Sequence, residues 1–271
     1  MMKIKSLFLL MIIAAIGCSS TSNKQKTVIT EIPAAPALYY LEDDSTGFFY
    51  MALGGSYKLS SEQSEFINSI KSVSFNLYDS ANNRHSIYIL EKLEDNFGKV
   101  GLSELFCLYS ISLDISTFNI GSKLKVIFDC GDKYYYVDSN LKSLREVTYK
   151  NSKPLILLPY IESKKADSIN FSMYAIRHHE PDDEYLPSSE DFRLTIRSPK
   201  GKLIWVSNYG SDFLTVVGTI KPQNTGGYEK YSCLWNFRNN SGDISPQGLY
   251  NAELTIPAKP NNYFTQFEFI R

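Results

Sequence analysis

The sequence predicts an all-β protein built from two β-sandwich domains in tandem. Aromatic residues make up 14% of the chain, with 19 Tyr and 16 Phe, and such side chains favour strands. Short segments with an apolar residue at every second position recur in both halves, separated by turn residues. The chain does not alternate strand and helix patterns, which argues against a parallel α/β sheet.

The first residues form a targeting segment. A basic start, Met1-Met-Lys-Ile-Lys5, precedes an apolar run from Leu7 to Ile16 that is too short to cross a bilayer as a helix. The run ends in Ala15-Ile16-Gly17-Cys18, which resembles the lipobox of bacterial lipoproteins. The resemblance implies a signal peptide over residues 1–17 and acylation of the Cys18 thiol. The alternative is an ordinary signal peptide, in which Cys18 carries no lipid.

Residues 18–37 predict a flexible tether, because they are polar at first, end in a Pro-rich stretch and cannot bury a core. A lipid on Cys18 would attach the folded part to a membrane of the bacterial cell envelope. We expect the outer membrane or the cell surface rather than the inner membrane. The chain has 28 basic and 29 acidic residues without a basic cluster, so nucleic acid is not an expected partner.

A first β-sandwich is expected over residues 38–150. Its predicted strands are Phe48–Leu53, Val73–Leu77, His85–Leu90, Leu105–Ile115, Leu124–Cys130 and Lys133–Val137. The segment His85–Leu90 is predicted to return as the hairpin partner of the strand before it. A short helix is expected at Ser60–Ile70, where a capping-like start precedes apolar residues at helical spacing.

Three cysteines remain after Cys18. Cys107 and Cys130 fall on the apolar faces of two predicted strands, so a disulfide between them is possible and would add about 3 kcal/mol. The alternative is two reduced, buried cysteines, because periodicity does not establish contact between the strands. Cys233 alternates with Trp235, which indicates a core residue rather than an activated thiol.

A linker is expected over residues 151–167. Its apolar middle, Leu155–Ile161, is expected to pack between the domains or to pair as an edge strand. Pro154 and Pro159 do not fit a central strand, because proline cannot donate to the ladder.

A second sandwich, of immunoglobulin-like type, is predicted over residues 168–271. Seven short strands separated by frequent turns are typical of that fold, and we expect it for the first domain as well. The predicted strands are Ile169–Ile176, Phe192–Arg197, Leu203–Val206, Phe213–Val217, Tyr231–Phe237, Tyr250–Ile256 and Phe264–Ile270.

A fixed order of aromatic and turn residues runs through this domain. It consists of Phe192, Gly201, Trp205, Phe213, Trp235, Gly242, Pro246, Gly248 and Tyr250. In this order the segment over roughly residues 168–256 resembles the BsuPI-like intracellular proteinase inhibitor domain. It is also similar to other bacterial immunoglobulin-like modules, including the C-terminal domain of the flagellar hook-capping family. The resemblance implies the fold, for which Trp205, Trp235, Gly242, Pro246, Gly248 and Tyr250 are the signature, and it implies proteinase inhibition as a possible activity.

Candidate metal ligands cluster in two places. The segment His178-His179-Glu180-Pro-Asp182-Asp183-Glu184 combines two imidazoles with carboxylates, a set that can bind zinc or another divalent ion. Adjacent residues of an extended segment point to opposite sides, so we interpret it as a solvated acidic loop. Glu42-Asp43-Asp44 offers oxygen ligands for calcium but has no regular loop spacing, which favours exposed charge. We therefore predict neither a metal site nor a cofactor.

The sequence contains no nucleophile, phosphate-binding or dinucleotide motif, so we do not expect an enzyme. The predicted function is a membrane-anchored lipoprotein that acts as a non-enzymatic protein-binding or structural module. Its partner would contact the His178–Pro187 loop or the Gly210–Tyr228 segment. The alternative is a proteinase inhibitor that uses the second domain. A carbohydrate-active enzyme would require a cleft with paired carboxylates.

Overall fold

The computed structural model describes residues 27–29, 32–55, 58–78, 81–96, 99–101, 104–117, 123–151 and 153–271. The predicted signal peptide and Cys18 lie outside these residues, so the lipid anchor stays a prediction. Among the residues described, no helix is both long and apolar enough to span a membrane.

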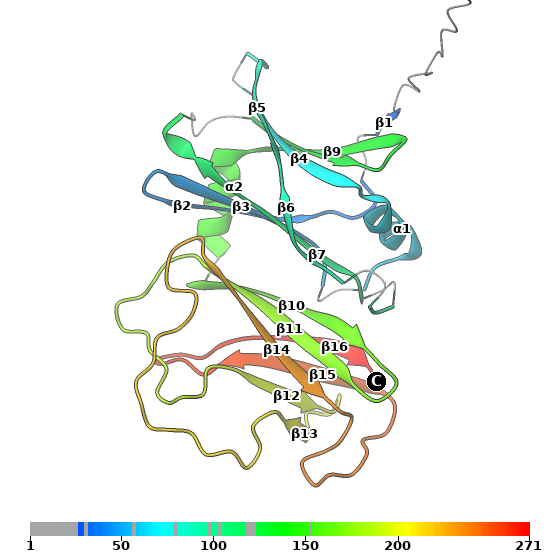
Figure 1. Ribbon diagram of the computed structural model, residues 1–271, viewed down its shortest axis with the longest axis vertical. Helices are drawn as coiled ribbons and strands as arrows, with labels where there is room; N and C mark the ends of the chain where they lie inside the picture. The colour runs from blue at the N-terminus through cyan, green and yellow to red at the C-terminus, as the bar shows by residue number, and fades with distance from the viewer. Residues whose placement is uncertain are drawn as a thin grey trace, which may run out of the picture.

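Four β-sheets stack face to face along the long axis of the molecule (Figure 1). The first has the order β1 (Thr27–Ile29), β9 (Lys133–Asn140), β8 (Lys123–Asp129), β4 (Ser72–Tyr78) and β5 (Arg84–Ile89). The second has the order β2 (Ala37–Asp43), β3 (Thr46–Gly54), β7 (Phe106–Asp114) and β6 (Glu91–Asp95). The third consists of β10 (Leu155–Lys164), β11 (Ile169–Arg177) and β14 (Tyr228–Trp235). The fourth has the order β13 (Leu203–Val206), β12 (Arg193–Arg197), β15 (Leu249–Ile256) and β16 (Tyr263–Ile270).

The all-β prediction with two sandwiches is thus confirmed. The first two sheets form one sandwich and the last two form the other. The strand pairs are antiparallel except for the short parallel pairing of β1 with β9.

Three hydrophobic cores fill the three spaces between the four sheets. Each sandwich has its own core, and a third core lies between the two sandwiches. The two central sheets therefore bury both faces. Along β3, Met51 points into the core of the first sandwich, whereas the neighbouring Tyr50 and Ala52 belong to the core between the sandwiches. The hydrophobic effect consequently holds the two sandwiches together as one body.

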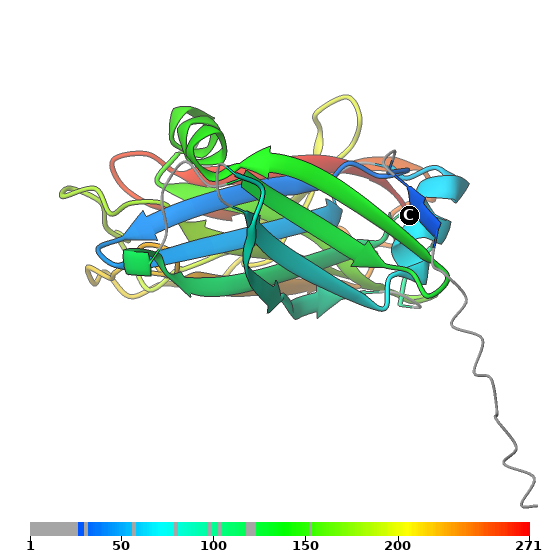
Figure 2. The ribbon, with the colours of Figure 1, turned by 90° about the horizontal axis from the view of Figure 1, so that it is seen from above.

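Two helices flank the first sandwich at its opposite ends (Figure 2). Helix α1 (Ser61–Ser69) begins at the expected place, with a capping box between Ser60 and Gln63. Helix α2 (Leu141–Asn151) was not expected. It buries Leu141 and Leu144 against the first sandwich.

All six strands predicted for the first sandwich are present. Strands β2 and β6, at the edges of the second sheet, were not predicted. The flexible tether predicted over residues 18–37 is wrong for its second half, part of which is ordered against the first sandwich. Strand β1 pairs with β9, and Ala34, three residues before β2, is buried in the core of the first sandwich.

Six of the seven strands predicted for the second sandwich are present. The prediction for Phe213–Val217 was wrong, because this segment is an exposed loop in which only scattered backbone groups are paired. The seventh strand is β10, which arises from the expected linker. Among the described strands it pairs with β11 alone, at the edge of its sheet, and its residues Ile156, Leu158 and Tyr160 belong to the core between the sandwiches. Both alternatives for Leu155–Ile161 are therefore confirmed.

The signature residues of the second domain serve its folding. Trp235 is completely buried, contacts the ring of Tyr250 at a centroid distance of 5.5 Å, and donates from Nε1 to the carbonyl of Arg238 at 2.8 Å. The Tyr250 hydroxyl donates to the Pro246 carbonyl at 2.6 Å, which fixes the bend before β15. Gly242 has a φ of 91° in the turn between them. Trp205 is half-buried on β13, and Gly248 directly precedes β15.

Of the two alternatives for Cys107 and Cys130, the possible disulfide is not formed, and both are free, buried cysteines. Cys107 lies on β7 of the second sheet, whereas Cys130 follows β8 of the first sheet, so shared burial did not bring the sulfurs into a bond. Burial raises the pKa of the Cys107 thiol to about 12, which keeps it protonated. Cys233 is free and half-buried against the core of the second sandwich, in agreement with the prediction of a core residue.

One close approach of backbone fixes how the sandwiches meet. The Tyr50 hydroxyl of β3 donates to the Gly226 carbonyl at 2.5 Å. Gly226 has a φ of 73°, and a Cβ at this position would overlap with the ring of Phe48. Only glycine fits this left-handed conformation beside an aromatic ring.

We expect Gly226→Ala to lower the free energy of unfolding by about 2–3 kcal/mol, through backbone strain plus the clash with Phe48. Gly201→Ala is the matched control, since Gly201 has a φ of 80° and no described residue lies within 4 Å of its added Cβ. The control should lose only about 1 kcal/mol. If urea unfolding gave the same loss of unfolding free energy for both variants, the contact with Phe48 would not contribute to stability.

Candidate functional site

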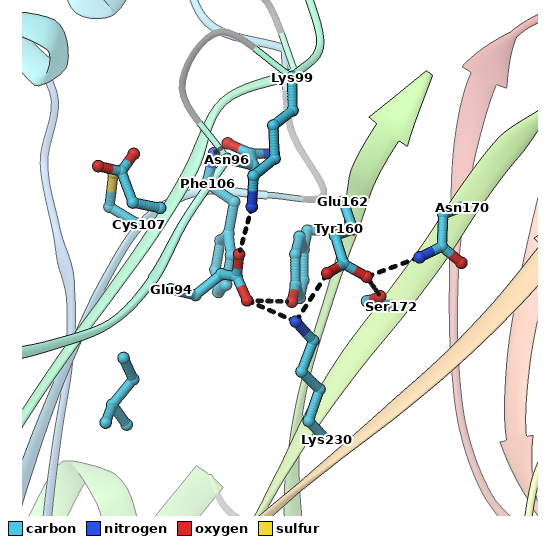
Figure 3. Close-up of polar contacts among 12 residues, drawn as sticks. Glu94, Asn96, Lys99, Phe106, Cys107, Tyr160, Glu162, Asn170, Ser172 and Lys230 are labelled. Carbon is cyan, nitrogen blue, oxygen red and sulfur yellow. Dashed lines mark hydrogen bonds and ion pairs between the residues drawn. The ribbon is translucent and has the colours of Figure 1, made fainter. Parts of the chain in front are cut away.

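A polar network lies in the apolar interface between the two sandwiches (Figure 3). We call it the Glu94 network, and it comprises Glu94, Lys99, Tyr160, Glu162, Asn170, Ser172, Tyr174 and Lys230. Lys230 Nζ donates to Glu94 Oε2 at 2.7 Å and to Glu162 Oε1 at 3.0 Å, so one ammonium joins two carboxylates. Glu94 belongs to the first sandwich and the other two residues to the second.

Each carboxylate of the network has further donors. Glu94 is only 6% exposed, and its Oε2 also accepts from the Tyr160 hydroxyl at 2.8 Å. Glu162 Oε2 accepts from Asn170 Nδ2 at 2.7 Å and from Ser172 Oγ at 2.8 Å. Such donors offset the cost of taking two carboxylates out of water.

Strand geometry brings these side chains together. Glu162 lies on β10, Ser172 on β11 and Lys230 on β14, three neighbouring strands of one sheet. Ser172 pairs with Ser232 of β14. Side chains two residues apart on a strand share a face, so Lys230 lies on the same side as Ser232. Glu94 reaches the site from β6, at the edge of the facing sheet. Lys99, in the segment after β6, adds a second cation, with its Nζ 3.7 Å from Glu94 Oε1.

The pKa values of the network reflect this pairing. Burial alone would raise the pKa of Glu162, but the hydrogen bonds from Lys230 and Ser172 outweigh it and lower the pKa. For Lys230, burial acts to lower the pKa, while the two carboxylates outweigh burial and raise it. Burial, followed by the Glu94 charge, raises the pKa of Tyr174 to about 12. Both partners of the Lys230–Glu162 pair are therefore charged at neutral pH.

The network is suited to holding two sheets in register. A glycosidase also uses two carboxylates, but it leaves space between them for substrate and water. Here the Lys230 ammonium occupies the space between the carboxylates and bonds to both. Directional bonds of this kind define one relative position of two surfaces that the hydrophobic effect alone would leave free to slide.

The acidic segment after β11 differs from its interpretation as a solvated loop. His179, Glu180, Asp182 and Asp183 are exposed, as expected. His178 is only 5% exposed, and the side chain of Glu184 is buried in an ion pair with Arg177 at 2.6 Å.

The two histidines also lie on the same side, contrary to our expectation. Their Nδ1 atoms are 3.3 Å apart, because β11 ends at Arg177 and the chain bends there, so strand alternation no longer applies. Within the described part of the chain, no group of three or more His, Cys, Asp or Glu side chains is arranged to hold a metal ion.

The acidic segment Glu42-Asp43-Asp44 has both exposed and buried side chains. Asp43, the last residue of β2, and Asp44, in the turn that follows, are both exposed, as predicted. The side chain of Glu42 is only 9% exposed, and it pairs with Arg145 of α2 at 3.0 Å. The unpredicted helix α2 explains this difference, because it covers Glu42 and supplies Arg145.

The predicted contact segment Gly210–Tyr228 contains the most apolar exposed loop of the second sandwich. Apart from Tyr228, which opens β14, the exposed large apolar residues of this region are Tyr209, Phe213, Leu214, Val216 and Val217. Leu214 is 71% exposed and Val217 is 79% exposed. We call residues 209–217 the apolar loop.

Comparisons with known proteins provide no family for this chain. No protein-family model matches the sequence, and no curated protein matches it. Among solved structures, dimeric latent PorU from Porphyromonas gingivalis is similar over 94% of this chain, at 10% identity and a TM-score of 0.41. The chain spans only 21% of the length of that protein. The alpha chain of the chicken interferon gamma receptor matches over 88% of this chain and 98% of its own, at 10% identity and a TM-score of 0.23.

The Glu94 network was not predicted from the sequence. Glu94, Glu162 and Lys230 come from three distant segments, and no spacing rule connects them. The predicted strand began at Tyr231, so Lys230 lay just outside it, whereas the observed strand β14 begins at Tyr228 and contains Lys230. A lysine inside a strand with an apolar face indicates an exposed face or a buried anionic partner, and only the fold shows that two carboxylates are the partner.

We expect Lys230→Met to lower the free energy of unfolding by about 2–4 kcal/mol, because Glu94 would remain buried beside Tyr160 without its main cation. The matched control is Lys125→Met. Both lysine side chains are 31% exposed, but Lys125 pairs with the surface residue Asp138 at 3.6 Å. The control should change stability by less than about 1 kcal/mol in denaturant unfolding. If both variants lost a similar unfolding free energy, the Glu94 network would stabilise the protein no more than a surface ion pair does.

Proposed function

We propose that this protein is a membrane-anchored lipoprotein of the bacterial cell envelope that acts as a non-enzymatic protein-binding module. The observation that carries the proposal is the apolar loop, where five large apolar side chains are exposed within nine residues. Contiguous exposed apolar surface on a folded protein is typical of an interaction site. Its aromatic members, Tyr209 and Phe213, are residue types that contribute strongly to binding.

The apolar loop is held in place at its C-terminal side. Leu186 and Gly218 exchange two backbone hydrogen bonds, at 2.8 and 2.9 Å. Ser189 and Leu214 exchange two more, one of them through the Ser189 hydroxyl, each at 3.0 Å. A loop fixed in this way loses less conformational entropy when it binds, which favours affinity.

The position of the apolar loop suits a protein attached through its N-terminus. The segment between β13 and β14 lies on the left side of the molecule in Figure 1, whereas β1, which follows the predicted tether, lies at the upper right. A tether that attaches at β1 would leave the loop accessible on the other side of the stack. This separation favours a protein partner over the membrane as the target of the loop.

The second candidate function is proteinase inhibition. It is favoured by the same fixed and exposed loop, because an inhibitor presents a rigid segment to the protease cleft, and by the resemblance of residues 168–256 to the BsuPI-like domain. A panel of serine proteases incubated with equimolar protein separates the two functions. Loss of protease activity with the wild-type protein, reversed by Leu214→Asp, would support inhibition; unaffected proteases would exclude it for that panel.

We expect a photo-crosslinking residue at Leu214 to yield a discrete protein adduct in intact cells, because this side chain would lie in the interface. Adding Val217→Asp should lower the yield of that adduct at least about tenfold, since a charge opposes burial of the loop. The matched control places the crosslinker at Ile89, an apolar residue of β5 that is 66% exposed on the first sandwich. The same adducts from both positions, or none from Leu214, would refute binding by the apolar loop.

We expect Cys18→Ser to move the protein from the membrane fraction to the soluble fraction, because the acyl chains that hold it would be missing. Cys233→Ser is the control and should leave the protein in the membrane fraction. Fractionation followed by detergent partitioning measures both. Membrane attachment of the Cys18→Ser variant would contradict the lipid anchor while leaving the role of the apolar loop open.

A further inference from the structure

The His178–His179 pair lies where the second sandwich meets α2 of the first sandwich. The backbone N–H of His178 donates to the Pro154 carbonyl at 2.9 Å, which holds this residue next to the start of β10. The ring of Tyr149, on α2, makes an edge contact with the His178 ring at a centroid distance of 4.4 Å. His178 is therefore held through its backbone next to β10 and through its ring against α2.

His179 is held by its backbone while its ring stays at the surface. The carbonyl of His179 accepts a hydrogen bond from Arg177 Nη1 at 3.3 Å. Arg177 is itself completely buried and is anchored by Glu184 and by the carbonyl of Pro222. One imidazole is thus buried and the other exposed, and the planes of the two rings are 82° apart.

We propose that His178 and His179 form a chelating site for a borderline divalent cation, with Zn²⁺ as the best fit. Two nitrogens 3.3 Å apart, each about 2.0–2.1 Å from one zinc ion, subtend an angle of about 105° at the metal, which is close to tetrahedral. The Nδ1 atom of each ring faces the other imidazole, so the two Nδ1 atoms are the ligands.

The protonation state of the pair fits this role. A hydrogen bond between two Nδ1 atoms requires one of them to carry a proton and the other to offer its lone pair. When both Nδ1 atoms bind zinc, the proton moves to Nε2 of the same neutral ring, and the net charge of the ring does not change. Burial, and next the neighbouring His179, lower the pKa of His178, so this ring is neutral at physiological pH.

The surrounding charge also favours a cation. Glu180, Asp182 and Asp183 are exposed on the same segment and contribute negative potential. The buried Arg177 is neutralised by Glu184. Because the chain supplies two ligands, two tetrahedral positions are left for water or for a donor group of a bound partner.

Calorimetric titration of the full chain with Zn²⁺ tests the proposal. We expect one zinc ion per chain, and His179→Ala should weaken binding at least about tenfold, since loss of even an outer-shell residue costs that much at metal sites. His179 is exposed, so its variant should fold. His178→Asn, with folding checked by its melting temperature, tests the buried ligand. His85→Ala removes the remaining histidine of the chain and should bind zinc like the wild type.

A nitrogen NMR spectrum of the labelled histidines supplies an independent readout. Zinc should shift the Nδ1 resonances of His178 and His179 and leave those of His85 unchanged. Absence of zinc binding by the wild-type chain, equal affinity of the His179→Ala variant, or weakening by His85→Ala would each overturn the proposal. A substitution of Co²⁺ for Zn²⁺ should give the strong visible absorption of a four-coordinate site, and a weak six-coordinate spectrum would contradict the tetrahedral geometry.

Discussion

The structure depends on the apolar character of both faces of its two central sheets. A sheet in an ordinary sandwich has one face in the core and one in water. Here β3 and β11 bury successive residues, so Tyr50 and Tyr174 belong to the core between the sandwiches while Met51 and Met173 belong to the two sandwich cores. Exposing the middle core would bring a large apolar surface into water, which is why the two sandwiches form one stack. The short segment between α2 and β10 sets the two halves close together, but the buried surface holds them there.

The Glu94 network adds direction to this contact. Apolar burial is not directional, and aromatic stacking, such as that of Phe106 on Tyr160 at 4.3 Å, tolerates small shifts. Lys230 bonds to carboxylates from both sandwiches, and a shift of one sheet would leave a buried charge without its partner. Tyr50 and Gly226 restrict the same contact at a second point, through a hydrogen bond and a close backbone approach.

The rigid stack supports two neighbouring features on one side of the second sandwich. The backbone pairing of Leu186 with Gly218 joins the segment that follows the histidine pair to the apolar loop. A protein that contacts the loop would therefore approach the edge of the segment that carries His178 and His179. The two proposals are independent in their chemistry, since one rests on exposed apolar side chains and the other on two imidazole nitrogens. Both place function on loops that a fixed scaffold presents.

Local patterns in the sequence determined the strands, the capped helix α1 and the folding role of Trp235 and Tyr250, because period-two alternation, capping and turn chemistry act over a few residues. Continuous apolar runs such as Leu155–Ile161 also indicate strands that are buried on both faces. Such a run does not show which sheet covers the second face. Only the tertiary structure decided that Glu94, Glu162 and Lys230 meet, that Cys107 and Cys130 stay apart, and that the rings of two adjacent histidines converge. Each of these depends on where separate segments, or a bend at the end of a strand, place side chains in space, and spacing along the chain carries no information about that.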